Sequence, residues 1–171
     1  MISRATLFIV AGLLSSGAIA MSVIDAGKVC LFSGISGVIT MNGKPAANAR
    51  LVRTVNRAKD ITDETTTDEN GYFEMPPVFE RTITKFLPQE FVASQTIDVF
   101  YDGRPAIEMW SGVKRSQEEN AEAKGKPLVV KCELTLKERN FVQVNGGPIF
   151  SRCEWDVIPD EKYNGPLFDE S

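Results

Sequence analysis

Short strand-like runs separated by strong turn signals fill this sequence and limit the folds it can adopt. Asn42-Gly43 and Asp102-Gly103 readily take the two positive φ values of a type I′ hairpin turn, and residues 68–71 form a further tight turn. The runs between the turns alternate apolar and polar residues or are rich in β-branched ones, at residues 29–32, 35–41, 49–55, 65–67, 72–75, 95–101, 104–110, 128–136, 141–144 and 149–155. No segment carries a long apolar period of about 3.6 residues. The pattern therefore predicts an all-β sandwich or barrel.

The length and composition are those of one folded domain. The chain has 171 residues, of which 43% are hydrophobic and 25% charged. We expect a signal peptide at residues 1–20, a β-sandwich at residues 28–158 and an acidic, loosely ordered tail at residues 159–171. The formal net charge is −4 and the charges of both signs are interspersed, which argues against a nucleic-acid partner.

Histidine is absent from the sequence. It is the side chain whose unperturbed pKa lies nearest neutrality, and it serves in most hydrolytic triads and many zinc sites. Its absence excludes Ser-His-Asp and Cys-His mechanisms, and no local motif indicates carboxylate, lysine or tyrosine chemistry. The sequence therefore predicts a protein that is not an enzyme, with no catalytic residue, no cofactor and no metal. A cofactor-free enzyme using carboxylates is the remaining alternative, and it would need two acids of raised pKa in one cleft.

The first 20 residues have the composition of an export signal. Arg4 supplies a positive charge, residues 5–20 are apolar or small, and residues 18–20 (Ala-Ile-Ala) give the pattern that signal peptidase reads. We therefore expect a periplasmic or secreted protein, cleaved after residue 20. Two alternatives remain open. The uncharged run continues to Ile24, near the ~20 residues that an inner-membrane anchor needs, or translation begins at Met21 and the protein is cytoplasmic. A membrane contact is expected only if the segment stays uncleaved.

The three cysteines are Cys30, Cys132 and Cys153, and an odd number in an exported protein allows one internal disulfide and one spare thiol. Cys132 and Cys153 lie in two apolar runs that could be antiparallel neighbours, so we favour a disulfide between them. Three buried, reduced cysteines are the alternative if the protein is cytosolic.

The segment from residue 35 to residue 75 resembles the opening of prealbumin-like domains. Three pieces carry the resemblance: residues 36–39 (Ser-Gly-Val-Ile), residues 42–51 (Asn-Gly-Lys-Pro-Ala-Ala-Asn-Ala-Arg-Leu) and residues 67–73 (Thr-Asp-Glu-Asn-Gly-Tyr-Phe). Carboxypeptidase regulatory-like and collagen-adhesin B-repeat domains share this order of strand, Gly-x-Pro turn, leading alanine and Thr-Asp-x-x-Gly-x-Phe turn. The resemblance implies a single antiparallel Greek-key β-sandwich of about seven to eight strands, transthyretin-like.

The full chain is similar to a small bacterial family, some of whose members are associated with contact-dependent secretion systems. That resemblance implies a non-enzymatic exported protein-binding module of the bacterial cell envelope, such as an immunity or adaptor protein linked to a secretion system. Two activities of prealbumin-like domains are disfavoured. 5-Hydroxyisourate hydrolase uses histidines and a C-terminal Tyr-Arg-Gly-Ser, whereas this chain ends at residues 168–171 with Phe-Asp-Glu-Ser, and the lysine of an adhesin isopeptide bond is replaced by Val38.

The stretch at residues 78–91 is the candidate protein contact. It carries three phenylalanines and several charges without a clean period, and Phe and Arg are favoured at interface cores. The candidate contact residues are Phe79, Arg81, Phe86, Leu87 and Phe91. The alternative is that the phenylalanines cap one open end of the sandwich, since a buried Phe is usually core. Strand addition at an unpaired sheet edge is a further route to a partner, although the sequence does not identify the edge.

Two ligand hypotheses compete with a protein partner. Trp110 and Trp155 could form a sugar-stacking platform, which would make the chain a carbohydrate or cell-wall binding β-sandwich, although a sandwich tryptophan is more often core. Residues 68–71, with three acids at residues 60–64, are oxygen-rich enough to suggest calcium. Their spacing matches no calcium-loop signature, and a turn favours the same residues.

Overall fold

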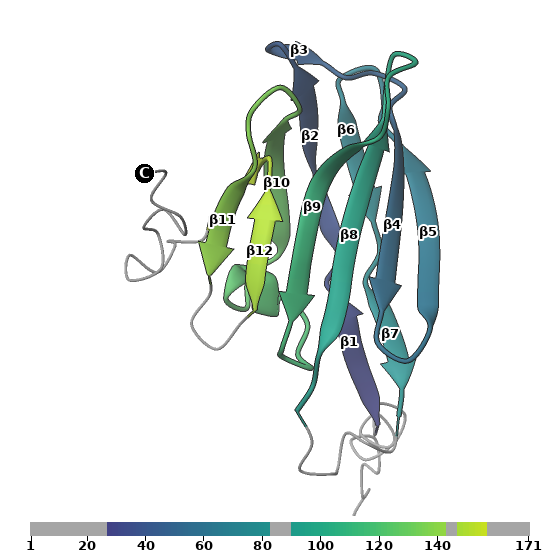
Figure 1. The fold of residues 1–171 in the computed structure, drawn as a ribbon, viewed down its shortest axis with the longest axis vertical. Helices are drawn as coiled ribbons and strands as arrows, with labels where there is room; N and C mark the ends of the chain where they lie inside the picture. The colour runs from purple at the N-terminus through teal and green to yellow at the C-terminus, as the bar shows by residue number, and fades with distance from the viewer. Residues whose placement is uncertain (1–26, 83–89, 143–146, 157–171) are drawn as a thin grey trace, which may run out of the picture.

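The computed structural model describes residues 27–82, 90–142 and 147–156, which form the all-β domain that the turn pattern predicts (Figure 1). The elements are, in chain order, β1 (Lys28–Phe32), β2 (Ile35–Met41), β3 (Lys44–Pro45), β4 (Arg50–Asn56), β5 (Asp60–Thr66), β6 (Tyr72–Met75), β7 (Val78–Arg81), β8 (Ala93–Phe100), β9 (Ile107–Lys114), the 3₁₀ helix η2 (Ala121–Ala123), β10 (Leu128–Glu133), β11 (Arg139–Val142), β12 (Pro148–Ser151) and β13 (Cys153–Glu154). The expected signal peptide at residues 1–20 and tail at residues 159–171 lie outside the described residues.

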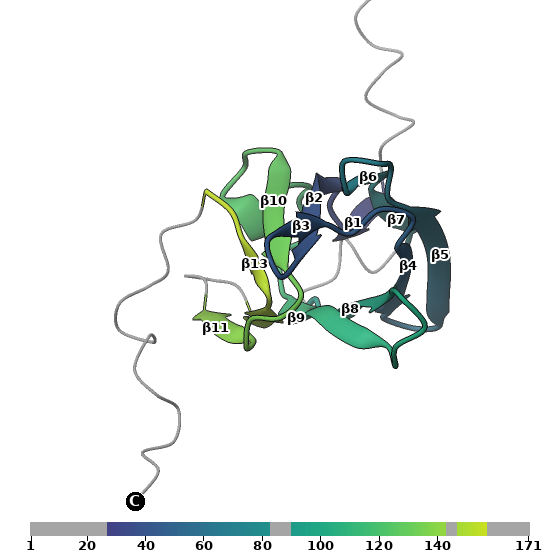
Figure 2. The same ribbon diagram turned by 90° about the horizontal axis from the view of Figure 1, so that it is seen from above.

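The strands form three sheets, two of which face each other. A six-stranded sheet has the order β11-β12-β9-β8-β4-β5, and a five-stranded sheet has the order β13-β10-β2-β3 with β6 also beside β2. β1 and β7 form a separate pair. Seen from above in Figure 2, the six-stranded sheet runs along the lower and right sides of the domain, and the five-stranded sheet lies above it. The arrangement is sandwich-like.

The number of strands and one strand direction differ from the expected antiparallel sandwich of seven to eight strands. The described residues contain thirteen strands, and β2 pairs with β10 in parallel. The runs at residues 29–32 and 35–41 form β1 and β2, which are separated by Ser33-Gly34 and belong to different sheets. The three acids at residues 60–64 lie in β5, which pairs with β4 along its whole length. β5 is an edge strand with few apolar residues, so hydrophobic periodicity does not mark it.

The hairpin turns follow the prediction. Asn42 and Gly43 have φ values of 54° and 71°, and Asp102 and Gly103 have φ values of 56° and 64°. Both dipeptides therefore take the two positive φ values that a type I′ turn requires. The first turn joins β2 to β3 at one end of the five-stranded sheet.

A glycine lets β2 and β10 approach each other. A Cβ added at Gly37 would lie 2.0 Å from the backbone carbonyl oxygen of Val130, closer than any real Cβ contact. The side chain is therefore excluded by the neighbouring strand itself, and glycine is needed to keep the parallel pair in register. That pair forms the middle of the surface described below.

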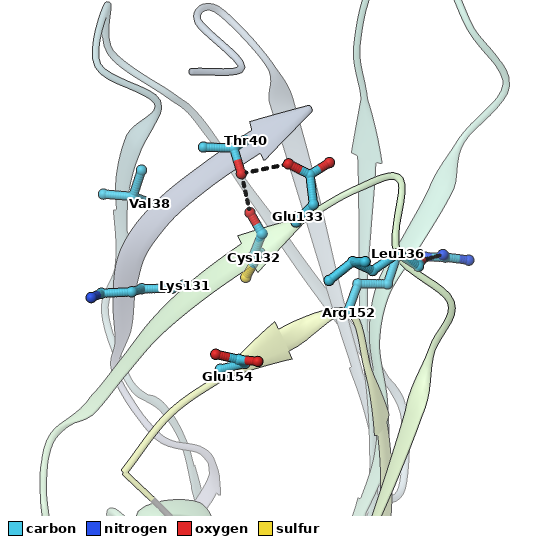
Figure 3. A pocket seen from close by; sticks show the side chains of 8 residues that line it. All are labelled: Val38, Thr40, Lys131, Cys132, Glu133, Leu136, Arg152 and Glu154. Atoms are coloured by element: carbon cyan, nitrogen blue, oxygen red, sulfur yellow. Dashed lines mark hydrogen bonds between the residues drawn. The ribbon is translucent and has the colours of Figure 1, made fainter. Parts of the chain in front are cut away.

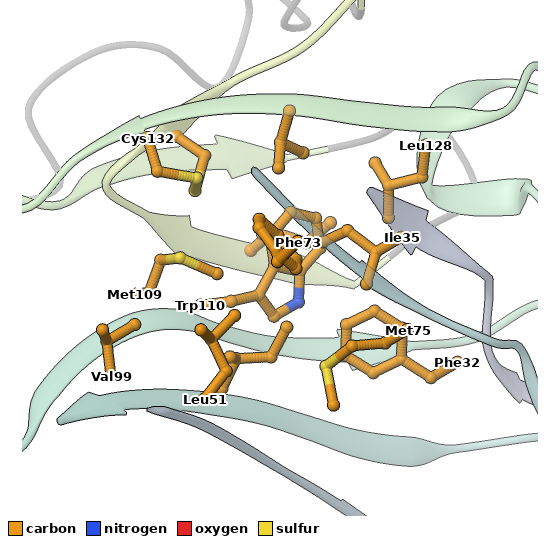
Figure 4. Packing of buried hydrophobic residues seen from close by; sticks show 14 of the residues in the cluster. Phe32, Ile35, Leu51, Phe73, Met75, Val99, Met109, Trp110, Leu128 and Cys132 are labelled. Carbon is orange, nitrogen blue, oxygen red and sulfur yellow. A yellow bond between two sulfur atoms is a disulfide. The ribbon is translucent and has the colours of Figure 1, made fainter. Parts of the chain in front are cut away.

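The core lies between the two larger sheets, as Figure 4 shows, where alternate side chains of each strand point inward. Trp110, Phe32 and Phe73 are at most 1% exposed. The Trp110 ring centroid lies 5.9 Å from that of Phe32 and 5.0 Å from that of Trp155. Phe141 extends the cluster, with its centroid 4.5 Å from that of Trp155. Both tryptophans are therefore packed within the domain.

Candidate binding surface

Alternate side chains of the five-stranded sheet point away from the core and form its outer face. Val38 on β2 and Val129 on β10 are 37% and 58% exposed. The parallel register sets Val38 beside Lys131, and the neighbouring strands extend this row, with Tyr72 beside Val38 and Glu154 beside Lys131. A single row of side chains thus crosses β6, β2, β10 and β13.

A pocket of about 420 Å³ opens on this outer face, and we call it the outer-face pocket (Figure 3). Its volume is within the range of roughly 300–1,000 Å³ that is usual for binding sites. β2, β10, β13 and the turns next to them supply its lining, which consists of Val38, Thr40, Lys131, Cys132, Glu133, Leu136, Arg152 and Glu154. The pocket therefore exists only where chain segments more than 90 residues apart in sequence are paired.

Glu133 is the most strongly bound side chain of the pocket. Its carboxylate accepts hydrogen bonds from the backbone N–H groups of Asn42 and Gly43, both at 2.9 Å, and from Thr40 Oγ1 at 2.9 Å. Burial would raise the pKa of Glu133, but hydrogen bonds from Thr135, Gly43 and Thr40 outweigh it and lower the pKa to about 2. Glu133 is therefore an anion that ties the β2–β3 turn to the end of β10, and its oxygens are already occupied.

The guanidinium group of Arg152 is likewise engaged in contacts within the protein. Its Nε donates to the Glu108 carbonyl oxygen at 2.9 Å, and its Nη2 lies 3.0 Å from a carboxylate oxygen of Glu138. Its Nη1 donates to the carbonyl oxygen of Leu136. Arg152 therefore fixes the turn that carries Leu136 at the rim of the pocket.

In the outer-face pocket, one cation and several apolar side chains are available to contact a ligand. Glu154 pairs with Arg139 at 2.9 Å, whereas Lys131 has no ion-pair partner within the described part of the chain. Leu136 is 50% exposed and Val38 is 37% exposed. The outer-face pocket thus offers exposed apolar surface beside an available ammonium group.

Of the contact residues predicted from the sequence, Phe79, Arg81 and Phe91 do not line this pocket. Phe79 is half-buried in β7 with Lys28 Nζ 3.9 Å from its ring centroid, and Arg81 is exposed at the end of β7. Phe91 is 5% exposed and belongs to the core, so its side chain offers little surface to a partner. Phe86 and Leu87 lie outside the described residues. The outer-face pocket was missed because each strand shows only one or two exposed apolar residues, which carry no signal alone.

The sugar-stacking platform is not found. Trp110 is fully buried, and Trp155 is half-buried against the core, with its Nε1 donating to the Glu122 carbonyl oxygen at 3.0 Å. Neither indole face is presented to solvent as a carbohydrate site requires.

The turn at residues 68–71, which the sequence suggested as a calcium site, is held together by its own hydrogen bonds. One carboxylate oxygen of Asp68 accepts from the backbone N–H groups of Asn70 and Tyr72, both at 2.8 Å. Within the described ranges, no three acidic or cysteine side chains are grouped closely enough to hold a metal ion. The same ranges contain no helix of the length and hydropathy that crossing a membrane requires.

A carboxylate enzyme would need a pair of acids in a cleft. The pKa of Glu108 is raised by burial and further by the nearby Glu138 and Asp98. Glu108 is not among the residues that line the outer-face pocket. This site therefore gives the carboxylate alternative no support.

A charged network that the sequence did not indicate is buried at the end of the core near η2. Lys114 Nζ lies 2.6 Å from Glu122 Oε2, and the two side chains are 2% and 3% exposed. Glu122 also accepts from Ser33 Oγ at 2.5 Å and Gln95 Nε2 at 2.8 Å. Burial would raise the pKa of Glu122, but Lys114 and these hydrogen bonds hold it below its ordinary value. The network is closed to solvent, so we assign it a structural role.

Glu122 lies in the short helix η2 within the polar segment at residues 116–126, yet it is 2% exposed. A charged residue in a polar segment gives no local sign of burial, because the partner that compensates its charge comes from another strand. The spare thiol, Cys30, lies buried beside this network, and burial raises its pKa to about 11.

Cys132 and Cys153 form a disulfide between β10 and β13, directly beneath the outer-face pocket. We expect the double variant Cys132→Ala with Cys153→Ala to lose about 3 kcal/mol of unfolding free energy, because the bond closes a loop across 21 residues and so restricts the unfolded chain. Urea unfolding followed by far-UV circular dichroism measures the loss. Reduced wild-type protein is the control and should unfold at nearly the same urea concentration as the variant. A loss below about 1 kcal/mol would contradict the prediction.

The fold and this surface define an all-β, sandwich-like domain with a pocket on an exposed sheet face. Residues 35–137 match the family described as a domain of unknown function, DUF6795. Because the match covers more than half of the chain, the protein belongs to this family. The matched segment runs from β2 past β10 and includes Val38, Lys131 and Leu136 of the outer-face pocket. No curated protein and no solved structure matches the chain, and the comparisons identify no prealbumin-like family.

Proposed function

We propose that this protein is a non-enzymatic protein-binding module of the bacterial cell envelope, which binds a partner protein at the outer-face pocket. The observation that carries the proposal is the pocket itself, where exposed apolar side chains lie on a hydrogen-bonded sheet beside Lys131. Apolar surface gathered in one place on a domain marks interaction sites. A partner that inserts an apolar side chain removes this surface from water, which stabilises the complex.

The charge at the pocket defines the partner further. Glu133, Glu154 and Arg152 are engaged within the protein, and Lys131 is the charged side chain left for a ligand. We expect the partner to present an acidic group next to its apolar anchor, since complementary charge fixes the orientation of a complex.

We propose that the fold is a prealbumin-like Greek-key sandwich, supported by the turn and strand pattern of residues 35–75. Export to the envelope is supported by the composition of residues 1–20. A role as an immunity or adaptor protein linked to a secretion system is supported by the resemblance of the whole chain. A carbohydrate-binding role lacks the exposed tryptophan on which it depended.

The test is quantitative capture of a partner by pocket variants. We expect the double variant Val38→Gln with Leu136→Gln to recover at least about tenfold less partner from the host envelope fraction than wild type, because anchor pockets carry most of the energy of an interface. The protein carries a tag fused after Ser171, and partners are quantified by mass spectrometry.

The matched control is Phe150→Gln on β12 in the other sheet. Phe150 is 38% exposed and Val38 is 37% exposed, so Phe150→Gln removes exposed apolar surface from a different face. All variants should unfold within about 0.5 kcal/mol of wild type, as surface substitutions usually do. Equal partner capture by the pocket variant and wild type would show that the interface lies elsewhere. Recovery of the protein solely from the cytosol would overturn the proposed export.

A further inference from the structure

The end of the described chain leads back to the outer-face pocket. β13 runs antiparallel to β10, and the chain then continues to Asp156, which forms an ion pair with Lys126 just before β10 begins. The preceding residue, Trp155, is anchored through its Nε1 to the Glu122 carbonyl oxygen. The described chain therefore ends at Asp156 beside the start of β10, the strand that carries the pocket.

The pocket is within reach of the chain that follows. Lys126 and Leu136, the pocket residue that follows the end of β10, are ten residues apart in sequence, so they are separated by at most about 33 Å at an extended rise of about 3.3 Å per residue. Residues 157–166 also number ten, and an extended chain spans about 3.3–3.6 Å per residue. Leu167 and Phe168 can therefore reach any part of the pocket.

The composition of this segment complements the pocket. Leu167-Phe168 is an apolar pair followed directly by Asp169-Glu170. The pocket offers exposed apolar side chains beside Lys131, whose ammonium has no ion-pair partner among the described residues. An apolar anchor with an adjacent carboxylate is the chemistry that we expect of the external partner.

We infer that residues 165–171 bind in the outer-face pocket of their own chain and compete with the partner protein. Competition between the tail and a partner protein rests on the proposed binding function, whereas binding of the tail in the outer-face pocket does not depend on that function. Leu167 and Phe168 cover Val38 and Leu136, and the acids that follow face Lys131. Because the segment is tethered, its effective concentration at the pocket is in the millimolar range, so even a weak interaction keeps the pocket occupied.

The experiment uses a fluorescent peptide with the sequence of residues 157–171 and the full chain. In the double variant Leu167→Ser with Phe168→Ser, the tethered tail loses its anchors and retains its charges. We expect the peptide to bind this variant about tenfold more tightly than it binds wild type, in which the tethered tail competes. Adding Val38→Gln and Leu136→Gln should abolish binding, whereas adding Phe150→Gln should leave it unchanged. A peptide with Asp169→Asn and Glu170→Gln should bind more weakly, with a smaller dependence on salt.

Each outcome bears on the inference. No binding of the peptide to the tail variant, or binding that Val38→Gln with Leu136→Gln leaves intact, would overturn it. Concentration-dependent dimers of wild type that the tail variant does not form would also overturn it, by assigning the pocket to the tail of a second copy. Partner capture separates the two proposals. If capture depends on Val38 and Leu136 but the peptide does not bind, only the tail inference fails. If the peptide binds but partner capture does not depend on Val38 and Leu136, only the proposed function fails.

Discussion

Replacing Lys114 with methionine is expected to lower the free energy of unfolding by about 3–5 kcal/mol, the cost of leaving one charge of a buried pair without its partner. Lys114 Nζ lies 2.6 Å from Glu122 Oε2, and both side chains are almost fully buried. Methionine fills much of the space of the lysine stem, so the change removes charge with little loss of volume. The loss is measured by urea unfolding at pH 7.

The control is the double variant Lys114→Met with Glu122→Leu, which removes both charges. Apolar replacement of a whole buried pair is often neutral or stabilising, so this variant should recover most of the lost stability. Ser33 and Gln95 donate to Glu122 and would lose that acceptor, which limits the recovery. If Lys114→Met alone unfolds within about 1 kcal/mol of wild type, the pair does not carry the energy that we assign to it.

The pH dependence gives an independent check. In wild type the folded-state pKa of Glu122 is lowered, so its contribution to stability is present above its unfolded-state pKa and is lost as the pH falls through the folded-state pKa. Without Lys114, burial dominates and raises the folded-state pKa of Glu122. The destabilisation caused by Lys114→Met should therefore be smaller at pH 4 than at pH 7. A constant difference across this range would contradict the assignment.

Replacing Trp110 with alanine is expected to cost about 3–5 kcal/mol, as the loss of a large core side chain usually does. Trp110 is fully buried and its ring contacts those of Phe32 and Trp155. Its Nε1 donates to Gln95 Oε1 at 3.3 Å, so the substitution leaves both a cavity and an unpaired buried acceptor. Thermal unfolding measures the effect, and the midpoint should fall by at least about 8 °C.

The matched substitutions separate the two causes. Trp110→Phe retains most of the ring contacts but loses the hydrogen bond to Gln95. It should therefore be less stable than wild type and more stable than Trp110→Ala. Val129→Ala on the outer face, where the side chain is 58% exposed, should change stability by no more than about 0.5 kcal/mol. A Trp110→Ala variant as stable as Val129→Ala would show that the centre of the core lies elsewhere.

The buried network and the outer-face pocket can be tested separately. Lys114 and Glu122 lie at the end of the core near η2 and line no part of the pocket. They are linked to it through Trp155, which donates to the Glu122 carbonyl oxygen and holds the chain just before residues 157–171. Stability variants in the network and binding variants at Val38 and Leu136 should therefore give distinct effects, the first on unfolding and the second on ligand capture.

Features of the sequence that act locally determined the all-β class and the hairpin turns. Asn42-Gly43 and Asp102-Gly103 take positive φ values because these residue types tolerate them whatever surrounds the turn. Alternation marked most of β8 and the whole of β10, since burial of one sheet face imposes a period of two. The run expected at residues 104–110 covers only the first half of β9. Leu136 falls in the run expected at residues 128–136, but the strand ends at Glu133 and Leu136 is 50% exposed.

Only the tertiary structure decided the sheet order and the candidate site. The parallel pairing of β2 with β10 sets Val38 beside Lys131, and no local pattern encodes a contact between residues so far apart in sequence. The burial of Lys114 and Glu122 depends in the same way on β9 and η2 meeting in space. β5 was indicated only at its C-terminal end, by the run at residues 65–67, because an edge strand needs no apolar period. Local residue preferences therefore specify turns and strands, while the pocket arises from which strands become neighbours, and long-range packing alone determines that.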